Sequence, residues 1–278
     1  MFELLGKRIL TALIGIPAAI YLINSGGWMF IGAVTLLAVI AWHEYSTMLG
    51  CRQINGHYGL GLAGTLLLIG CAVLGNHQET IFIIFLFLFL CLAKAVSSSS
   101  SFTIEDASFT FFGIAYVGLT FSHLVLLRFS DNITSYTAGN VIMPAGAVYL
   151  WLAFVGTWAN DTFAYFVGTK FGKTKLCPAI SPNKTWEGAI GGLIGSLLGT
   201  AILGSLFHIP LSHGLIIGLL AGIAAPLGDL AESAIKRYTG VKDSGRLLPG
   251  HGGVLDRFDS IMFAVPAVYY YIYAFLLN

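Results

Sequence analysis

Charged side chains are rare in this chain, and three clusters of polar and charged residues stand out in its second half. The first cluster has Asp161; the second has Asn183, Lys184 and Thr185; the third has Asp229, Lys236, Arg237, Lys242, Asp243, Asp256, Arg257 and Asp259. Carboxylates bind divalent metal ions, and lysine or arginine neutralises phosphate groups. Together these residues indicate a site for a metal ion and a polyphosphate. Taken singly, each of them favours a salt bridge that anchors a loop.

The third cluster has the most regular spacing. Four polar residues recur three or four positions apart: Asp229, Glu232, Ser233 and Lys236. This spacing places them on one face of a helix. Pro226, just upstream, should free the backbone carbonyl of Gly222 and kink that helix. Asp256 and Asp259 are three residues apart at the start of the next expected helix, so their carboxylates can point the same way.

The second cluster is predicted to begin a helix. Ser181 followed by Pro182 is typical of an N-cap and the first helical residue. A helix N-terminus presents free N–H groups to an anion, and Lys184 adds a positive charge. We therefore expect a phosphate-binding turn at Ser181–Glu187.

Three motif-like runs do not have the context that their motifs require. Gly59–Gly64 matches G-x-G-x-x-G, but it lies in an apolar stretch with no preceding strand. Gly168–Thr174 resembles a P-loop but is one residue short, although Lys170 and Lys173 could still bind phosphate. His43–Glu44 lacks the second histidine of H-E-x-x-H, so we expect a solvated or structural pair.

Composition indicates which elements must position these residues. Only 10% of the 278 residues are charged and 56% are hydrophobic, whereas a soluble domain has about 25% charged residues. Mean hydropathy is +0.83. The net charge of +1 argues against the basic face of a nucleic-acid binder. We expect an all-α polytopic integral membrane protein without strands, because helices satisfy their own backbone hydrogen bonds in lipid.

About nine stretches have the roughly 20 mostly apolar residues that a transmembrane helix needs. They are 9–25, 27–49, 58–75, 79–96, 108–129, 143–168, 186–207, 213–235 and 259–277. Two of them carry a glycine at every fourth position: Gly191, Gly195 and Gly199, then Gly214, Gly218 and Gly222. Small residues at this spacing let helix backbones approach closely in lipid, so tight packing is expected.

The basic residues predict the orientation. If nine helices alternate and the N-terminus is cytoplasmic, 13 of the 14 Lys and Arg residues lie on the cytoplasmic side and only Arg128 lies outside. The C-terminus is then outside. We expect one continuous membrane domain, in which N-terminal helices (1–110) precede a catalytic region (111–278).

The run Ser233–Asp259 resembles the signature of the CDP-diacylglycerol synthase, or phosphatidate cytidylyltransferase, family. That signature is S-x-x-K-R-x4-K-D-x-[small]-x2-[apolar]-[P/G]-x-H-G-G-x-x-D-R-x-D, and the run has no departure from it. Asn160–Tyr165 and Ser181–Gly188 are also similar to the family, so the likeness extends from about residue 155 to the end. The N-terminal half resembles it only as apolar helices, and the short tail is similar to the bacterial branch.

The resemblance implies that CTP and phosphatidate condense to CDP-diacylglycerol and pyrophosphate, a step of phospholipid biosynthesis. On this basis Asp229, Asp256 and Asp259 are assigned to Mg²⁺ or Mn²⁺, with more than one ion. The assigned phosphate-neutralising residues are Lys236, Arg237, Lys242 and Arg257. Substrate binding is assigned to Asp161, Asn183, Lys184, Thr185, Asp243, His251, Gly252 and Gly253, of which the last three form either a tight loop at the nucleotide or a structural turn.

Family likeness also implies a homodimer in the inner cell membrane, with the active site at the cytoplasmic face and no nucleic acid among its partners. Two other classes remain as alternatives. One is another membrane phosphotransferase, such as a CTP-dependent lipid kinase or a CDP-alcohol phosphotransferase, although the D-G-x2-A-R motif of the latter is missing. The other is an ion-coupled transporter, which has no need of a dense Lys/Arg/Asp loop at one face.

Overall fold

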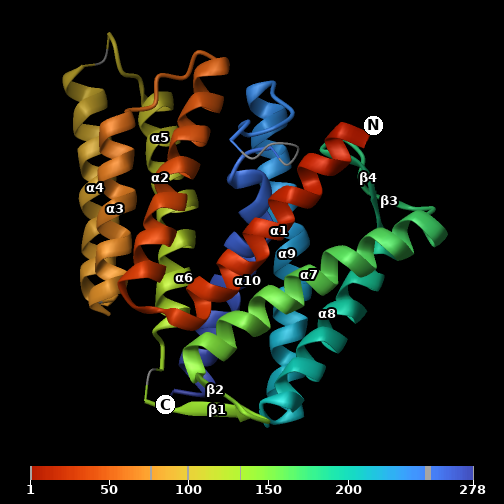
Figure 1. The fold of residues 1–278 in the computed structure, drawn as a ribbon. Helices are drawn as coiled ribbons and strands as arrows, with labels where there is room; N and C mark the ends of the chain where they lie inside the picture. The colour runs from red at the N-terminus through yellow and green to blue at the C-terminus, as the bar shows by residue number, and fades with distance from the viewer. Residues whose placement is uncertain (1, 76, 99, 132, 248–251, 278) are drawn as a thin grey trace. The chain divides into compact units, whose positions relative to one another are not determined.

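The chain is almost entirely helical (Figure 1). The computed structural model describes residues 2–75, 77–98, 100–131, 133–247 and 252–277, without the side chains of 2–12, 14 and 77. Its helices are α1 (Phe2–Ser25), α2 (Gly27–Cys51), α3 (Tyr58–Leu74), α4 (His77–Ser97), α5 (Ile104–Gly113), the π-helix η1 (Ile114–Leu119), α6 (Thr120–Arg128), α7 (Ala145–Phe171), α8 (Trp186–Leu206), α9 (Leu211–Thr239) and α10 (Leu255–Phe275). The strands are β1 (Ser135–Ala138), β2 (Val141–Pro144), β3 (Lys175–Cys177) and β4 (Ser181–Thr185).

The helices lie where the apolar stretches predict them. Each expected stretch coincides with a helix, and the fifth is the rod formed by α5, η1 and α6. Within the described residues, six helices are long and apolar enough to cross a membrane, while α3 and the 15–25 part of α1 are apolar but shorter. A helical protein with several potential membrane spans is thus confirmed, and the number of nine spans remains a prediction.

The helices divide into two compact units. Unit 1 comprises Met1–Leu126 and Ile235–Arg257, and unit 2 comprises Leu127–Ala234 and Phe258–Asn278. The C-terminal end of α9 and the first turn of α10 therefore belong to unit 1, together with most of the signature segment. These bounds differ from the expected regions 1–110 and 111–278, whose roles remain predictions.

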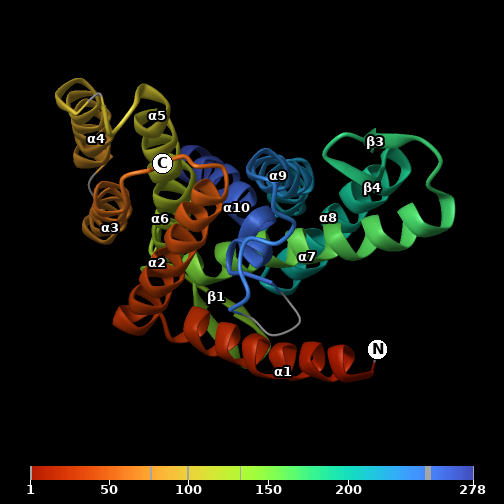
Figure 2. The ribbon, with the colours of Figure 1, turned by 90° about the horizontal axis from the view of Figure 1, so that it is seen from above.

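In unit 1, α2, α3 and α4 pack beside the rod of α5, η1 and α6 (Figures 1 and 2). Trp42 of α2 is buried, and its indole N–H donates to the backbone carbonyl of Tyr58 at 3.1 Å. Its ring occupies the space that a Cβ on Gly61 would need. Tyr45 donates its hydroxyl to the Phe109 carbonyl at 2.9 Å. Aromatic side chains over glycines thus fix the spacing of these helices.

In unit 2, the two glycine stripes pack α8 against α7 and α9. A Cβ on Gly195 of α8 would lie 2.6 Å from the Phe163 side chain of α7. A Cβ on Gly218 of α9 would lie 2.8 Å from the Leu197 Cα of α8. In lipid there is no hydrophobic driving force between helices, so van der Waals contacts between closely approaching backbones can hold these helices together. The expectation of tight packing by these glycines is confirmed.

Two short antiparallel hairpins contradict the expectation of a chain without strands. Ser135 of β1 lies opposite Pro144 of β2, and Lys175 of β3 lies opposite Thr185 of β4. Both hairpins lie in connections between helices. Lipid excludes strands with open edges only where they are exposed to the hydrocarbon, so the argument for an all-helical chain does not extend to these connections.

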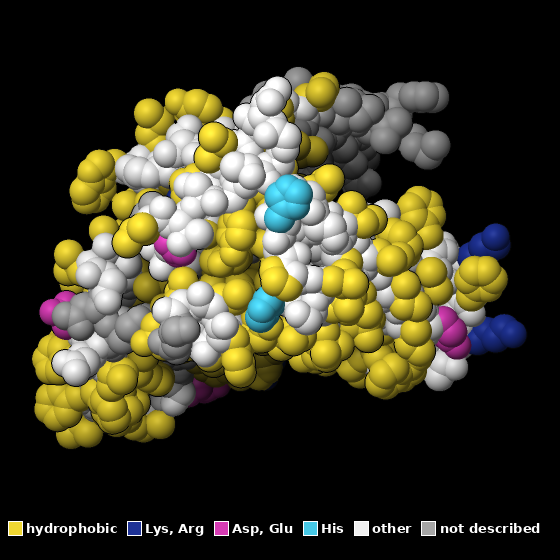
Figure 3. All heavy atoms as spheres, turned by 90° about the horizontal axis from the view of Figure 1, so that it is seen from below, with side chains coloured by type: hydrophobic (Ala, Val, Ile, Leu, Met, Phe, Trp, Pro, Cys, Tyr) yellow, Lys and Arg dark blue, Asp and Glu magenta, His cyan; other side chains and the backbone are white. Residues whose placement is uncertain are grey.

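Large apolar side chains cover much of the surface. On α4, for example, Phe82, Phe85 and Phe89 are 63%, 65% and 68% exposed. Figure 3 shows one face of the molecule on which hydrophobic side chains predominate and charged ones are few. Soluble monomers rarely expose apolar patches of this extent, so these side chains are suited to contact with lipid.

Candidate active site

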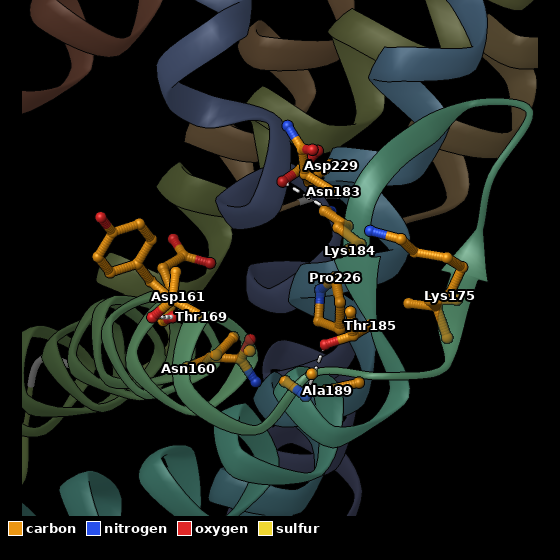
Figure 4. Close-up of a pocket in the computed structure, with 16 residues that line it drawn as sticks. Asn160, Asp161, Thr169, Lys175, Asn183, Lys184, Thr185, Ala189, Pro226 and Asp229 are labelled. Atoms are coloured by element: carbon orange, nitrogen blue, oxygen red, sulfur yellow. Dashed lines mark hydrogen bonds and ion pairs between the residues drawn. The ribbon is translucent and has the colours of Figure 1, made fainter.

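A cavity of about 560 Å³ in unit 2 gathers the first two charged clusters and the start of the third (Figure 4). Its polar lining consists of Asn160, Asp161, Tyr165, Thr169, Lys175, Asn183, Lys184, Thr185 and Asp229. Five of these are predicted site residues. They meet because α8 packs on α7 through its own glycine stripe, while α9 packs on α8 through the stripe Gly214, Gly218 and Gly222.

An ion pair in the cavity joins Lys184 to Asp229. The Lys184 Nζ lies 2.7 Å from Asp229 Oδ2, and the two side chains are 25% and 34% exposed. A partly exposed ion pair stabilises a protein by only about 0–1 kcal/mol. A substrate phosphate can therefore bind Lys184 and a metal ion can bind Asp229, and the loss of the ion pair costs the folded protein little stability.

The prediction that Ser181 and Pro182 begin a helix is wrong. Both lie in β4, and α8 begins at Trp186. Its N-cap is Thr185, whose hydroxyl accepts the backbone N–H of Gly188 at 3.1 Å. A threonine N-cap satisfies one of the donors that a helix start leaves open, whereas the fixed φ of proline is equally suited to an edge strand. The helix N-terminus still opens on the cavity, since Thr185 and Gly188 line it.

The P-loop-like run Gly168–Thr174 already binds an anion of the protein. The backbone N–H groups of Lys173 and Thr174 donate to the Glu187 carboxylate at 3.1 and 3.2 Å. A P-loop needs such amides for phosphate. These two are engaged by a carboxylate, which also holds the end of α7 to the start of α8.

Asn160 connects α7 to α9 next to the cavity. Its side-chain amide is buried and donates to the Gly222 carbonyl at 3.1 Å. This is the carbonyl that Pro226 was predicted to free, because proline has no N–H to donate four residues back. A buried carbonyl without a partner would cost about 1–3 kcal/mol. The predicted release of Gly222 is thus confirmed, and Asn160 supplies the missing donor.

Within unit 1, hydrogen bonds join described residues of the signature segment to one another. Lys236 is almost buried, and its Nζ lies 2.6 Å from Asp256 Oδ1. The other oxygen, Oδ2, accepts the backbone N–H groups of Ser244 at 2.9 Å and Gly253 at 2.8 Å. Gly252 has a φ of +85°, a conformation that favours glycine. Whether Gly252 and Gly253 belong to a loop at the nucleotide or to a structural turn remains a prediction, and His251 lies outside the described residues.

The other charged residues of the signature lie at the surface: Arg237, Lys242, Asp243 and Arg257. The Arg237 guanidinium donates to the Val241 carbonyl at 3.3 Å. Lys242 and Asp243 line a second cavity of about 900 Å³ in unit 1. Exposed cations at such a cavity can meet a phosphate without losing a buried partner.

Known proteins resemble this chain over nearly its whole length. The model of the cytidylyltransferase family matches residues 6–275. The chain belongs to the cytidylyltransferase family. A phosphatidate cytidylyltransferase of Synechocystis sp. is 36% identical over 283 residues, which cover 96% of each chain. A protein of the same name from Staphylococcus saprophyticus is 37% identical, over 93% of this chain and 95% of the relative. Another from Bacillus subtilis is 42% identical, over 61% of this chain and 60% of the relative.

In this cytidylyltransferase family member, two carboxylates of unit 2 fit a divalent cation. Asp229 borders the cavity, and a Cβ on the preceding Gly228 would meet the backbone carbonyl of Asp259. Mg²⁺ typically takes one or two carboxylates and completes its shell with water and phosphate oxygens. Asp229 and Asp259 lie on two contacting helices, α9 and α10, and their role as ligands of such an ion remains a prediction. In the described part of either unit, no three His, Cys, Asp or Glu side chains gather as ligands.

Asp256, the third predicted ligand, has another set of contacts. Its carboxylate accepts hydrogen bonds from Lys236, Ser244 and Gly253. These donors hold the loop together, and metal binding by Asp256 would have to displace some of them. The ligand role of Asp256 remains a prediction.

Four polar residues of the unit 2 cavity had no predicted role in binding: Asn160, Tyr165, Thr169 and Lys175. Asn160 could have been found in the sequence as an amide within an otherwise apolar stretch, next to Asp161. Lys175 had no such signal, because only the hairpin brings it to the cavity.

Proposed function

We propose that this protein transfers the cytidylyl group of CTP to phosphatidate, giving CDP-diacylglycerol and pyrophosphate. The observation that carries the proposal is the cavity of unit 2, where Lys184 and Asp229 meet beside a helix N-terminus. It lies in a chain that matches phosphatidate cytidylyltransferases over most of its length. A cation and a carboxylate are the components that a triphosphate and its metal ion require.

The reaction joins two anions. A phosphate oxygen of phosphatidate attacks the α-phosphorus of CTP, and the bond from that phosphorus to the oxygen bridging to the β-phosphate breaks. Pyrophosphate leaves with the electron pair. The attacking phosphate is already ionised near neutral pH, so no strong general base is needed. Catalysis therefore consists of positioning and of neutralising charge.

The residues divide these tasks between them. Lys184 and the N-terminus of α8 bind a phosphate in the unit 2 cavity, and Asn183 and Asp161 line its wall. Asp229 and Asp259 hold a divalent ion, Mg²⁺ or Mn²⁺, which supplies Lewis acidity and a template for phosphate oxygens when bound. Lys236, Arg237, Lys242 and Arg257 supply further positive charge in the signature segment.

The membrane orientation and the oligomeric state belong to the same proposal. The excess of Lys and Arg in alternate connections supports a cytoplasmic N-terminus and site, with the C-terminus outside. CTP then reaches the site from the cytoplasm, while the acyl chains of phosphatidate stay in the lipid. We expect a homodimer, as the family resemblance implies.

Pyrophosphate release by the purified protein tests the proposal. CTP and phosphatidate together should give CDP-diacylglycerol and pyrophosphate in equal amounts. Diacylglycerol, which lacks the attacking phosphate, should give none. Formation of CDP with a phosphorylated lipid would instead indicate a CTP-dependent lipid kinase, and the absence of any turnover would refute the proposal.

A further inference from the structure

Glu44 of α2 is a buried carboxylate that contacts the signature segment some 200 residues away. The residue is only 5% exposed. Its Oε1 accepts the backbone N–H of Val254 at 2.8 Å, and its Oε2 accepts that of Leu255 at 2.9 Å. Both amides stand at the start of α10, where N–H groups have no partner within the helix. The carboxylate therefore caps α10 from another helix, with a charge of the sign that a helix N-terminus favours.

Ser244 links this carboxylate to that of Asp256. The Ser244 hydroxyl lies 3.2 Å from Glu44 Oε2 and 2.9 Å from Asp256 Oδ2. Asp256 in turn contacts Lys236 at 2.6 Å. A continuous chain of polar contacts thus runs from Glu44 to two predicted catalytic residues, all of them within unit 1.

Two glycines of the signature segment leave room for Glu44. A Cβ on Gly245 would lie 2.6 Å from Glu44 Oε1, and a Cβ on Gly253 would overlap Glu44 Oε2 and the Ser244 hydroxyl. Neither glycine has a positive φ, so the backbone alone does not require glycine at these positions. The space that they leave is filled by the carboxylate.

We propose that Glu44 is the positioning residue of the signature segment, and this inference rests on the proposed function. Glu44 lines the second cavity, but its carboxylate oxygens are held by hydrogen bonds within the protein. It fixes Ser244, Val254 and Leu255, and through them the orientation of Asp256 and Lys236. The cost of burying a carboxylate is offset by charge-assisted hydrogen bonds to three donors. The N-terminal helices thereby contribute to turnover, although their sequence has no signature.

Glu44→Gln tests the inference with little change in size. The amide nitrogen cannot accept a hydrogen bond, so it leaves one of the α10 amides without an acceptor. We expect kcat for CDP-diacylglycerol formation to fall about 10–100-fold, as is typical when the support of a site residue is lost. Amide hydrogen exchange at 253–256 should accelerate, while exchange at 186–190 in unit 2 stays as in the unchanged protein.

Glu105→Gln is the matched control. Glu105 lies at the surface of unit 1 and accepts one exposed hydrogen bond, from Tyr238 at 3.3 Å. It should keep both wild-type turnover and wild-type exchange. Glu44→Gln with wild-type kcat would overturn the positioning role, and unchanged exchange at 253–256 would overturn the contact itself.

A second pair of variants keeps the test valid if Glu44→Gln does not fold. Gly245→Ala should lower kcat strongly when Glu44 is present, because the new methyl group displaces the carboxylate. In a Glu44→Ala background the space is empty, so adding Gly245→Ala should change kcat less than twofold. Equal effects of Gly245→Ala in both backgrounds would refute the inference.

Hydrogen exchange separates this inference from the proposed function. If the unchanged protein releases no pyrophosphate from CTP and phosphatidate, the proposed activity fails. The exchange at 253–256 would still show whether Glu44 caps α10. An active wild-type enzyme with no effect of either variant would refute only the role of Glu44.

Discussion

At the scale of single residues, the charged groups of the two units have different environments. Lys184 and Asp229 form a partly exposed pair in unit 2, which a phosphate and a metal ion can replace. Lys236 and Asp256 form an almost buried pair in unit 1, with side chains 11% and 7% exposed. Removing one partner of a buried pair leaves an uncompensated charge. The first pair is therefore suited to exchange with ligands, and the second to holding a loop in place.

Lys184→Ala should lower kcat/KM for CTP by about 100-fold, the usual loss when one donor to a developing charge is removed. Folding should be unaffected, because the ion pair is partly exposed. Steady-state kinetics and the elution profile in detergent measure the two effects. The control is Lys94→Ala in unit 1, since the Lys94 ammonium lies 5.6 Å from the centre of the Phe102 ring and does not line the cavity. Normal kinetics in Lys184→Ala would return this lysine to a structural role.

Asp229→Asn and Asp259→Asn should each lower turnover by orders of magnitude, because each removes a charged ligand while conserving size. The double variant should be far less than additive, since the two carboxylates act as a unit. Chelation of divalent ions should abolish activity, and Mg²⁺ or Mn²⁺ should restore it. Full activity in excess chelator would exclude the metal role, and additive effects would separate the two residues.

At the scale of elements, the unit 2 cavity depends on how closely α7, α8 and α9 approach. The glycine stripes place α8 within backbone contact of α9. The Glu187 carboxylate and the Thr185 N-cap then fix the hairpin that presents Lys184. Catalytic geometry tolerates only small errors, so packing of these helices and turnover should decline together.

Gly218→Ala should destabilise unit 2 by about 1–3 kcal/mol, the usual cost of one methyl group too many in a packed interior. Its Cβ would lie 2.8 Å from the Leu197 Cα, and a backbone atom cannot rotate away. Thermal unfolding in detergent measures the change as a lower Tm. Gly70→Ala on α3 is the matched control, because its Cβ would meet nothing within 4 Å. Equal Tm values for the two variants would contradict the packing role of Gly218.

At the scale of the whole molecule, the N-terminal helices support the signature segment. Arg52, at the end of α2, donates to the Tyr238 carbonyl at 2.8 Å, and its guanidinium lies 4.0 Å from the centre of the Tyr238 ring. Phe109 stacks on the same ring at 5.3 Å. With Glu44, these contacts all lie in unit 1 and join the first half of the chain to the C-terminal end of α9.

The membrane orientation can be measured by cysteine labelling of intact cells. The four native thiols are free and are replaced by serine first. A membrane-impermeant maleimide should label Ile133→Cys, which is 97% exposed, and should label Ala179→Cys and Leu247→Cys only after lysis. These positions come from the 13-to-1 division of basic residues. Ready labelling of Ala179→Cys in intact cells would invert the topology.

Features that depend on a local pattern of residues could be predicted from the sequence alone. Apolar length located the helices, the four-residue glycine spacing indicated their tight packing, and Pro226 predicted the open carbonyl of Gly222. The signature indicated the family, which the comparisons confirm. Each of these depends on residues close together in the chain, and so on the geometry of one helix or one turn.

Only the tertiary structure decided which distant residues meet. It made Ser181–Thr185 a strand, because pairing with β3 and the Thr185 cap outweigh the local Ser-Pro signal. The Asn160 side-chain amide donates to the Gly222 carbonyl, which Pro226 leaves without a backbone donor. Glu44 belongs to an incomplete H-E-x-x-H motif in the sequence, and in the structure its carboxylate caps α10. The contact of Glu44 with residues two hundred positions away cannot be predicted from residue spacing, because it is created by the packing of the chain and not by local periodicity.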